Sequence, residues 1–161
     1  MSRFKTVVPV PLGEIRRVEG KLGAAALAGQ LLTASDSFAA GNSHHAQSDG
    51  ATFALNGAGN SLGVLILVEQ EDMVTAADAI TVERAINTWG RAHVLKAGEE
   101  VTVILTAAAT IASGDKLAPD ANGKVVKVTG ATGEADPMFT AIETATTGAT
   151  GDALRILARV L

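Results

Sequence analysis

Hydrophobic and polar positions alternate most clearly between about residue 91 and residue 161, where the pattern predicts short β-strands. Successive side chains of a strand point to opposite faces. In one such run, Val101, Val103 and Leu105 alternate with Thr102, Ile104 and Thr106. In the final run, one face holds Leu154, Ile156, Ala158 and Val160, and the other holds Arg155, Leu157 and Arg159. This last strand is therefore predicted to be built into a sheet.

Glycine and asparagine mark the turns between these strands. Gly98 precedes the strand that begins near residue 100, and Asn122-Gly123 separates two further strand-like runs. Asn-Gly readily adopts the positive φ angles that a two-residue hairpin turn needs. This half of the chain contains no recognisable catalytic set of residues, so we expect a structural module and no enzyme.

The first sixty residues show weaker periodicity. Residues 4–11, FKTVVPVP, favour an extended conformation, while Pro9 and Pro11 restrict it to a sheet edge or to an arm that lies on a partner. Residues 21–32 fit a short helix and an extended segment equally well. Residues 33–60 are rich in Ala, Ser, Gly and Asn and predict a long loop. The residues expected to tether this loop are Phe38, Phe53 and Leu55.

These patterns predict a mainly β protein with three parts. Residues 1–20 form an extended N-terminal arm, and residues 21–60 form a loop-rich insertion that can hold a short helix. Residues 61–161 form the β domain. The longest apolar run, Leu62 to Val68, has the length of one strand and is too short to cross a membrane.

Composition and charge narrow the range of functions. The 161 residues include 3% aromatics and no cysteine, so the core has little area per residue and is expected to gain from oligomerisation. The net charge of −4 argues against binding to nucleic acid. Residues 1–21 nevertheless carry +3, which predicts a basic arm that docks on an acidic surface. The N-terminus lacks the apolar core of a signal peptide, so we expect synthesis in the cytoplasm and no membrane association.

Several groups of polar residues contain the residue types of a reactive site, but none has the required spacing. His44-His45 with Asp36 and Asp49 lacks convergent metal ligands. Ser35, Asp36, Ser43 and His44 lack the setting of a hydrolase triad, Glu69, Glu71 and Asp72 lack a calcium-loop pattern, and the Gly57–Gly63 run lacks dinucleotide-binding spacing. No catalytic residue, metal or cofactor is therefore predicted. Trp89, the single tryptophan, is predicted to fill the core or an oligomer interface, with ligand stacking as the alternative.

Residues 93–161 resemble one protein family. HVLKAGEEVTVIL, ATIASGDKLAPDANGKVVKV and MFTAIETATTGATGDALRILARVL follow one another in the order typical of the decoration, or cement, proteins of tailed-bacteriophage capsids. The resemblance extends back to residues 63–70, GVLILVEQ, as a first barrel strand, and it favours strands over a helix between residues 74 and 86. It implies a small β-barrel or β-tulip-like domain.

The resemblance also implies a function and a set of contacts. Proteins of this family sit on the outer surface of the expanded head as trimers at local three-fold positions, where they bind the major capsid protein and stabilise the shell. The arm residues then expected to contact the capsid are Arg3, Phe4, Lys5, Val7, Val8, Arg16 and Arg17. Two alternatives stay open: another virion subunit, such as a head-fibre base or tail protein, and a small β carrier or ligand-binding domain with its cofactor on Lys124.

Overall fold

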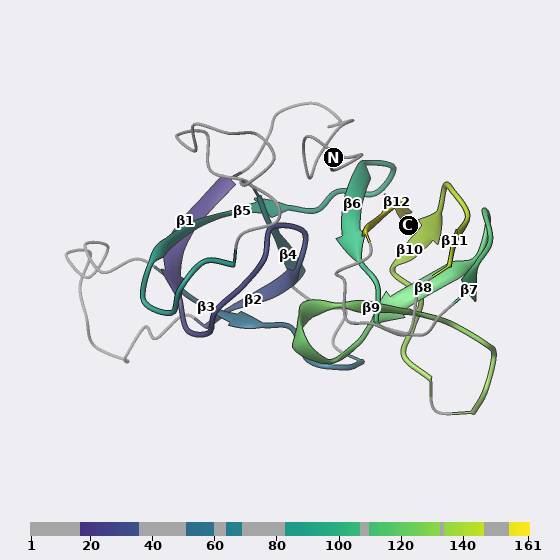
Figure 1. Cartoon of the computed structure of the whole chain (residues 1–161), viewed down its shortest axis with the longest axis horizontal. Coiled ribbons are helices and arrows are strands. Elements are labelled where there is room, and N and C mark those ends of the chain that lie inside the picture. Colours follow the sequence, from purple (N-terminus) through teal and green to yellow (C-terminus); the bar gives the residue numbers. More distant parts are fainter. Residues whose placement is uncertain are drawn as a thin grey trace.

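A computed structural model describes residues 17–35, 51–59, 64–68, 83–106, 110–132, 134–146 and 155–161. The fold is mainly β, as predicted, and consists of a closed barrel beside a curled sheet (Figure 1). The barrel strands are β1 (Arg17–Leu22), β2 (Leu31–Ser35), β3 (Ala51–Leu55), β4 (Val64–Leu67) and β5 (Trp89–Val94). The remaining strands are β6 (Glu100–Ile104), β7 (Thr110–Ile111), β8 (Lys116–Pro119), β9 (Val125–Lys127), β10 (Phe139–Ala141), β11 (Ala145–Thr146) and β12 (Arg155–Val160).

The barrel closes in the order β1-β3-β2-β4-β5. Strands β1 and β3 run parallel, and the other neighbouring pairs are antiparallel. The pairing of β1 with β5 sets Lys21 opposite Trp89 and Glu19 opposite Arg91. Closure of this kind leaves each strand with a neighbour on both sides, which satisfies backbone hydrogen-bonding groups that an open sheet would expose.

The second half forms a five-stranded antiparallel sheet in the order β6-β12-β10-β8-β9. Its two edges meet at a bridge between Leu105 and Val125, so the sheet curls back on itself. A separate ribbon pairs β7 with β11. Strand β12 lies between β6 and β10, which confirms the prediction that the last strand is built into the sheet.

Two apolar cores lie on either side of β4. The barrel core lies inside the barrel and contains Leu22, Ala26, Leu32, Phe53, Leu65, Leu67 and Ala92. The junction core joins the barrel to the sheet. From the barrel half it takes Ala28, Leu31, Val64, Ile66 and Val68, and from the second half Val101, Val103, Leu105, Ile111, Leu117, Val125, Phe139, Ala141, Ile156, Ala158 and Val160. All four residues of β4 are buried because alternate side chains enter different cores.

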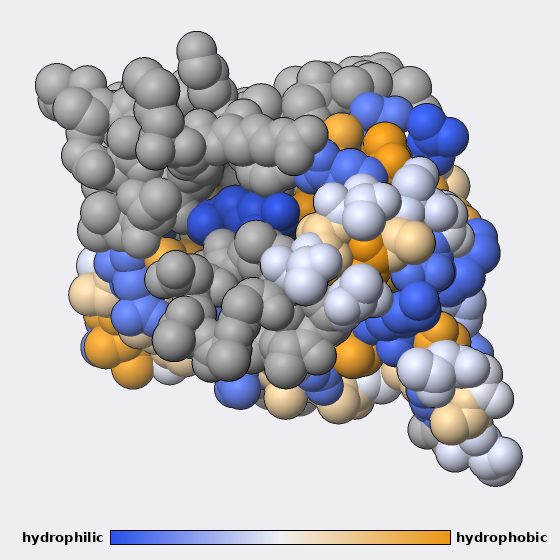
Figure 2. Space-filling model, turned by 45° about the vertical axis from the view of Figure 1, so that its right-hand side comes forward, coloured by the Kyte–Doolittle hydropathy of each residue, from blue (hydrophilic) through white to orange (hydrophobic). Residues whose placement is uncertain are grey.

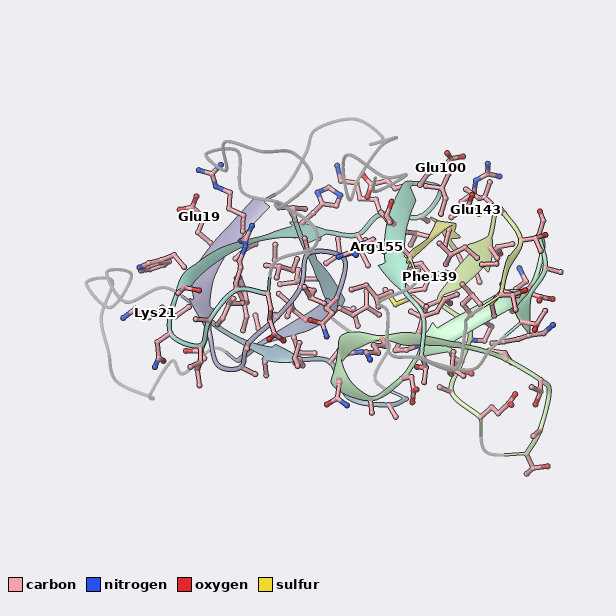
Figure 3. The ribbon with its side chains drawn as sticks, viewed as in Figure 1. Glu19, Lys21, Glu100, Phe139, Glu143 and Arg155 are labelled. Carbon is pink, nitrogen blue, oxygen red and sulfur yellow. The ribbon has the colours of Figure 1, made fainter. Side chains whose placement is uncertain are left out.

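Polar contacts also connect the two halves. Arg155 on β12 donates from Nη2 to the carbonyl of Ala28 at 2.8 Å, and Figure 3 places Arg155 between the barrel and the sheet. The loop between β8 and β9 packs on the barrel, where the amide of Gly123 donates to the carbonyl of Asn56 at 2.9 Å. Gln30, which is buried, donates to the carbonyl of Asn122 at 2.7 Å. The loop is therefore fixed at the junction.

Several sequence predictions agree with the local backbone. In β12, Ile156, Ala158 and Val160 are buried while Arg159 is exposed. Gly98, Asn122 and Gly123 all have positive φ angles. The turn at Asn122-Gly123 is longer than a two-residue hairpin, however, because a single 3-10 turn at Ala121–Gly123 separates β8 from β9.

The barrel does not lie where the sequence patterns located it. Residues 21–35 and 51–55, predicted as part of a loop-rich insertion, supply β2, β3 and the end of β1, and residues 21–32 form turns and strand ends with no helix. The closed barrel spans β1 to β5, whereas the prediction assigned the barrel to residues 61–161. Leu22, Leu32 and Phe53 explain the difference. In the sequence they are scattered among small residues, but in the structure they are fully buried in the barrel core. Within the described ranges, no helix is long and apolar enough to cross a membrane.

We predict that Gly123→Ala destabilises the protein far more than Gly114→Ala. Both glycines have positive φ angles, so alanine costs about 1 kcal/mol in backbone strain at either position. A Cβ at Gly123 would also collide with the carbonyl oxygen of Leu31, while a Cβ at Gly114 meets open space. Urea unfolding should show an additional loss of about 2 kcal/mol or more for Gly123→Ala. Equal losses would contradict the packing of this loop on the barrel.

Candidate interaction surface

The residues predicted to contact a capsid lie mostly outside the described part of the chain. Arg3, Phe4, Lys5, Val7, Val8 and Arg16 precede it, and Arg17 is the first residue of β1. The backbone of Arg17 pairs with His93 on β5. The basic segment therefore leads directly into the first strand of the barrel.

Trp89 does not fill the core of this chain. The side chain is 49% exposed at the start of β5. Its neighbour Gly90 faces the barrel interior, close to Leu22 and Leu67, and Ala92 belongs to the barrel core. Strand alternation therefore directs Trp89 outward. The predicted oligomer interface remains compatible with this position.

We define the Trp89 patch as Trp89, its neighbour Lys21, and Ile86, which is exposed three residues before Trp89 in the chain. The ammonium group of Lys21 lies 5.8 Å from the centroid of the indole ring, within the range of a cation–π contact. Ile86 is 55% exposed on the turn before β5, where the amide of Thr88 donates to the carbonyl of Ala85. The patch thus combines two large apolar side chains with one cation.

An ion pair, which carries no net charge, lies beside the Trp89 patch. Arg91 donates from Nε to Glu19 at 2.8 Å, and both side chains are exposed. Figure 3 shows Glu19 and Lys21 on the side of the barrel that is turned away from the sheet. Within the described residues Lys21 has no carboxylate partner, in contrast to Arg91. Lys21 is therefore the charge that distinguishes this surface.

A second surface, the β9 groove, lies beside the sheet and has a volume of about 530 Å³. Its apolar lining includes Ala118, Pro119, Val126, Val128 and Ala135. Its polar lining consists of Asp120, Lys127, Glu134 and Asp136. The loop that follows β9 extends away from the sheet and forms one wall (Figure 1). Figure 2 shows that hydrophilic residues cover much of the visible face of this half and leave only small apolar areas.

Glu134 organises the wall of the β9 groove. Its carboxylate accepts hydrogen bonds from the hydroxyl and amide of Thr129 and from the amides of Gly130 and Ala131. The hydroxyl of Thr129 is the main reason that the pKa of Glu134 lies below its usual range, and the backbone amides add to the effect. These donors favour the ionised form, so the groove wall carries a stable negative charge at neutral pH.

Lys127 does not neutralise the β9 groove. Its ammonium group lies 2.6 Å from the carboxylate of Asp115. The hydrogen bond from Lys127 lowers the pKa of Asp115, and the amide of Ala112 lowers it further. The Lys127 charge is therefore balanced by Asp115, which leaves Asp120, Glu134 and Asp136 to set the charge of the groove. Of these, Asp120 accepts a hydrogen bond from the hydroxyl of Thr106 at 2.6 Å.

One buried polar pair was not predicted from the sequence. His93 Nε2 lies 2.7 Å from Glu99 Oε2, and both residues are fully buried. The same carboxylate oxygen accepts the amide of Lys96 at 3.0 Å. His93 belongs to β5 and Glu99 precedes β6, so the pair secures the connection between barrel and sheet. The one feature of the sequence that indicates this pair is that His93 precedes the Gly98 turn and Glu99 follows it.

The structure bears on some of the other candidate sites from the sequence and not on others. Among the described residues, no group of three histidine, cysteine or acidic side chains converges for metal binding. His44, His45, Asp36 and Asp49, and also Glu69, Glu71 and Asp72, lie outside the described residues. Lys124, the lysine that the carrier alternative would modify, is half-buried next to Gly123, and the loop that holds both residues packs on the barrel. A carrier lysine needs a free tip, which this loop does not provide.

Comparison with known proteins identifies a shared fold. No family model matches the chain, and no curated protein matches its sequence. Among solved structures, the head fiber gp8.5 N base of bacteriophage phi29 is similar, with a TM-score of 0.56 and 14% sequence identity. The match covers 92% of this chain and 95% of the other. The two chains therefore share a fold along nearly their whole length.

We predict that His93→Leu destabilises the protein by about 3 kcal/mol, because it removes a hydrogen-bond partner from a buried carboxylate. Arg91→Leu is the matched control, since it removes the partner of the exposed Glu19 and should cost less than about 1 kcal/mol. Chemical denaturation of both variants measures the difference. Similar losses would contradict a structural role for the His93–Glu99 pair.

We predict that acidification loosens the loop held by Glu134. The pKa of Glu134 is lowered in the folded state, so its contribution is complete above the ordinary glutamate pKa of about 4.3 and is lost as the pH falls through the folded value. The protection factor of the Gly130 amide, which compares its exchange rate by NMR with that of an unstructured peptide at the same pH, should fall over that range. In Glu134→Ala, which removes the acceptor, the protection factor should already be low at neutral pH and should not change as the pH falls. A protected Gly130 amide in that variant would contradict the assignment.

Proposed function

We propose that this chain is a structural protein of a tailed-bacteriophage head and acts as a decoration protein on the outer capsid surface. One observation carries the proposal: the fold agrees along nearly the whole length of both chains with the base of a phage head fiber. The sequence resemblance of residues 93–161 to capsid decoration proteins points independently to the same part of the virion. The proposed partner is the major capsid protein.

A second candidate function is the base of a head fibre. The same structural match favours it, because the similar protein is the N base of such a fiber. The two functions share attachment to the head but differ in what projects from it. A decoration protein covers the shell as a compact layer, whereas a fibre base carries an elongated extension. Electron microscopy of virions labelled on this protein separates them.

The proposed mechanism is mechanical and includes no catalytic step. The buried pair His93–Glu99 is closed to substrates by its burial, and the ion pairs Arg91–Glu19 and Arg159–Glu100 connect neighbouring strands. A rigid body that touches several capsid subunits holds them together by multivalent binding, so weak contacts add up. Each bound copy stabilises the expanded shell by mass action.

The N-terminal arm is the proposed capsid contact. In any extended strand the backbone amides alternate in direction, so a strand formed by this segment would lack donors at Pro9 and Pro11 on one edge only. Such a strand would keep the amides of Val8 and Val10 on its other edge, which suits addition to the open edge of a partner sheet. Arg3, Lys5 and Arg16 add long-range attraction to an acidic surface.

We predict that purified protein added to depleted particles raises the temperature at which they release DNA. A variant lacking residues 2–15 retains β1 and should fold, but it should bind less and protect less because the arm is absent. Occupancy is measured on washed particles, and DNA release is measured with an intercalating dye. The double variant Arg3→Ala, Lys5→Ala keeps the arm length and tests the charge alone.

Two results would contradict this function. If the depleted particles are as heat-resistant as complete ones, the protein has no stabilising role. If the truncated protein occupies the particles as fully as the intact chain, the arm is not the contact. Binding without thermal protection, together with a visible extension on labelled virions, favours the fibre base.

A further inference from the structure

We propose that the Trp89 patch of one copy docks in the β9 groove of a second copy. The inference deepens the proposed function by specifying the surfaces through which the protein would form its oligomer. The inference rests on the proposed function only where it places the oligomer on a capsid. The contact between copies can be measured with the purified protein alone.

The Trp89 patch has the composition of an interface centre. Trp89 and Ile86 are 49% and 55% exposed, although the described residues bury nearly all their other large apolar side chains. Tryptophan is among the residues most enriched at interface positions that dominate binding energy. An exposed indole therefore gains much when a partner covers it. The overall shortage of aromatic residues in the chain makes this position unusual.

The β9 groove has the complementary shape and lining. Its volume of about 530 Å³ lies within the range of about 300–1,000 Å³ that is typical of pockets for small ligands. Val126, which is exposed, lies beside Val128 and Ala118 in an apolar strip. An indole ring can rest on such a strip while its N–H remains close to the polar rim. The groove therefore offers apolar contact together with a hydrogen-bond acceptor.

Charge makes a second copy the favoured occupant. Lys21 has no carboxylate partner within the described residues, and the groove carries Asp120, Glu134 and Asp136 while Lys127 is balanced by Asp115. Docking would bring the Lys21 ammonium toward this carboxylate rim, with the exposed Asp136 as its proposed partner. One chain thus presents both complementary surfaces, so copies of a single protein suffice to form the contact.

The placement of the two surfaces determines the type of assembly. The Trp89 patch lies on β1 and β5 of the barrel, whereas the groove lies along β8 and β9 of the sheet. Contact between different surfaces of identical chains is heterologous, and such contacts form a closed ring when the rotation between copies permits closure. A ring of three copies agrees with the proposed trimer. Each copy would then donate one tryptophan and receive another.

The experiment combines sedimentation with fluorescence. Because Trp89 is the single tryptophan, its emission reports directly on this surface. In a concentration series, association should shift the emission to shorter wavelength in step with the appearance of trimers in analytical ultracentrifugation. Trp89→Ala should weaken association at least about 30-fold, as expected for a dominant interface residue. The exposed position of the side chain leaves the core intact.

Charge reversal tests the pairing of the two surfaces. Lys21→Glu and Asp136→Lys should each weaken association about 10-fold or more, and the double variant should recover most of it. Lys116→Glu is the matched control, because Lys116 is exposed outside both surfaces and should leave association unchanged. The chain has no cysteine, so mixing Ile86→Cys with Ala135→Cys tests proximity through a disulfide between different variants.

The outcomes separate this interface from the proposed function. A protein that stays monomeric up to millimolar concentration with unchanged Trp89 emission overturns the interface. Association that is insensitive to Trp89→Ala, or single charge variants without recovery in the double variant, also overturns it. Capsid binding is measured in parallel with the same variants. Loss of the interface with intact capsid occupancy leaves the decoration function in place, whereas trimers without capsid occupancy count against that function alone.

Discussion

The burial of β4 on both faces is the constraint on which the rest of the structure depends. Leu65 and Leu67 enter the barrel core, while Val64 and Ile66 enter the junction core. Each fully buried side chain of this size contributes about 1.5–3 kcal/mol. A separation of barrel and sheet would expose one whole face of the strand. The two halves are therefore coupled, and the contacts of Gly123 and Arg155 form at a junction that apolar packing has already brought together.

The coupling between barrel and sheet matters for a protein that is proposed to hold capsid subunits together. A decoration protein transmits force between capsid subunits, so its contact surfaces must keep a fixed separation. In this chain the arm leads into β1, the Trp89 patch lies on β1 and β5, and the groove lies on the sheet. The junction core and the buried His93–Glu99 pair hold the Trp89 patch and the β9 groove in one body. On the proposed function, this rigidity is the property of the fold that matters.

Sequence patterns identified those elements whose signals are local. The alternation in β12 and the positive φ angles at Asn122 and Gly123 follow from side-chain geometry and from turn preferences. Strands β2 and β3 were missed because their stability comes from distant partners, such as Phe53 packed in the barrel core. The exposure of Trp89 depends on which face of β5 the barrel covers, and periodicity alone does not specify that face. The β9 groove needs segments near residues 58, 118, 126 and 135 to meet, which only the tertiary fold achieves.

A heterologous interface also carries a risk that the chain must control. Contacts between different surfaces extend into filaments when they fail to close, and an exposed tryptophan strengthens each contact. The net charge of −4 opposes association in free solution, whereas binding to a shell raises the local concentration of neighbouring copies. On the proposed model, a modest affinity between Trp89 and the β9 groove is therefore favourable. Copies would associate chiefly where the arm has already placed them, and the capsid lattice would select the closed ring.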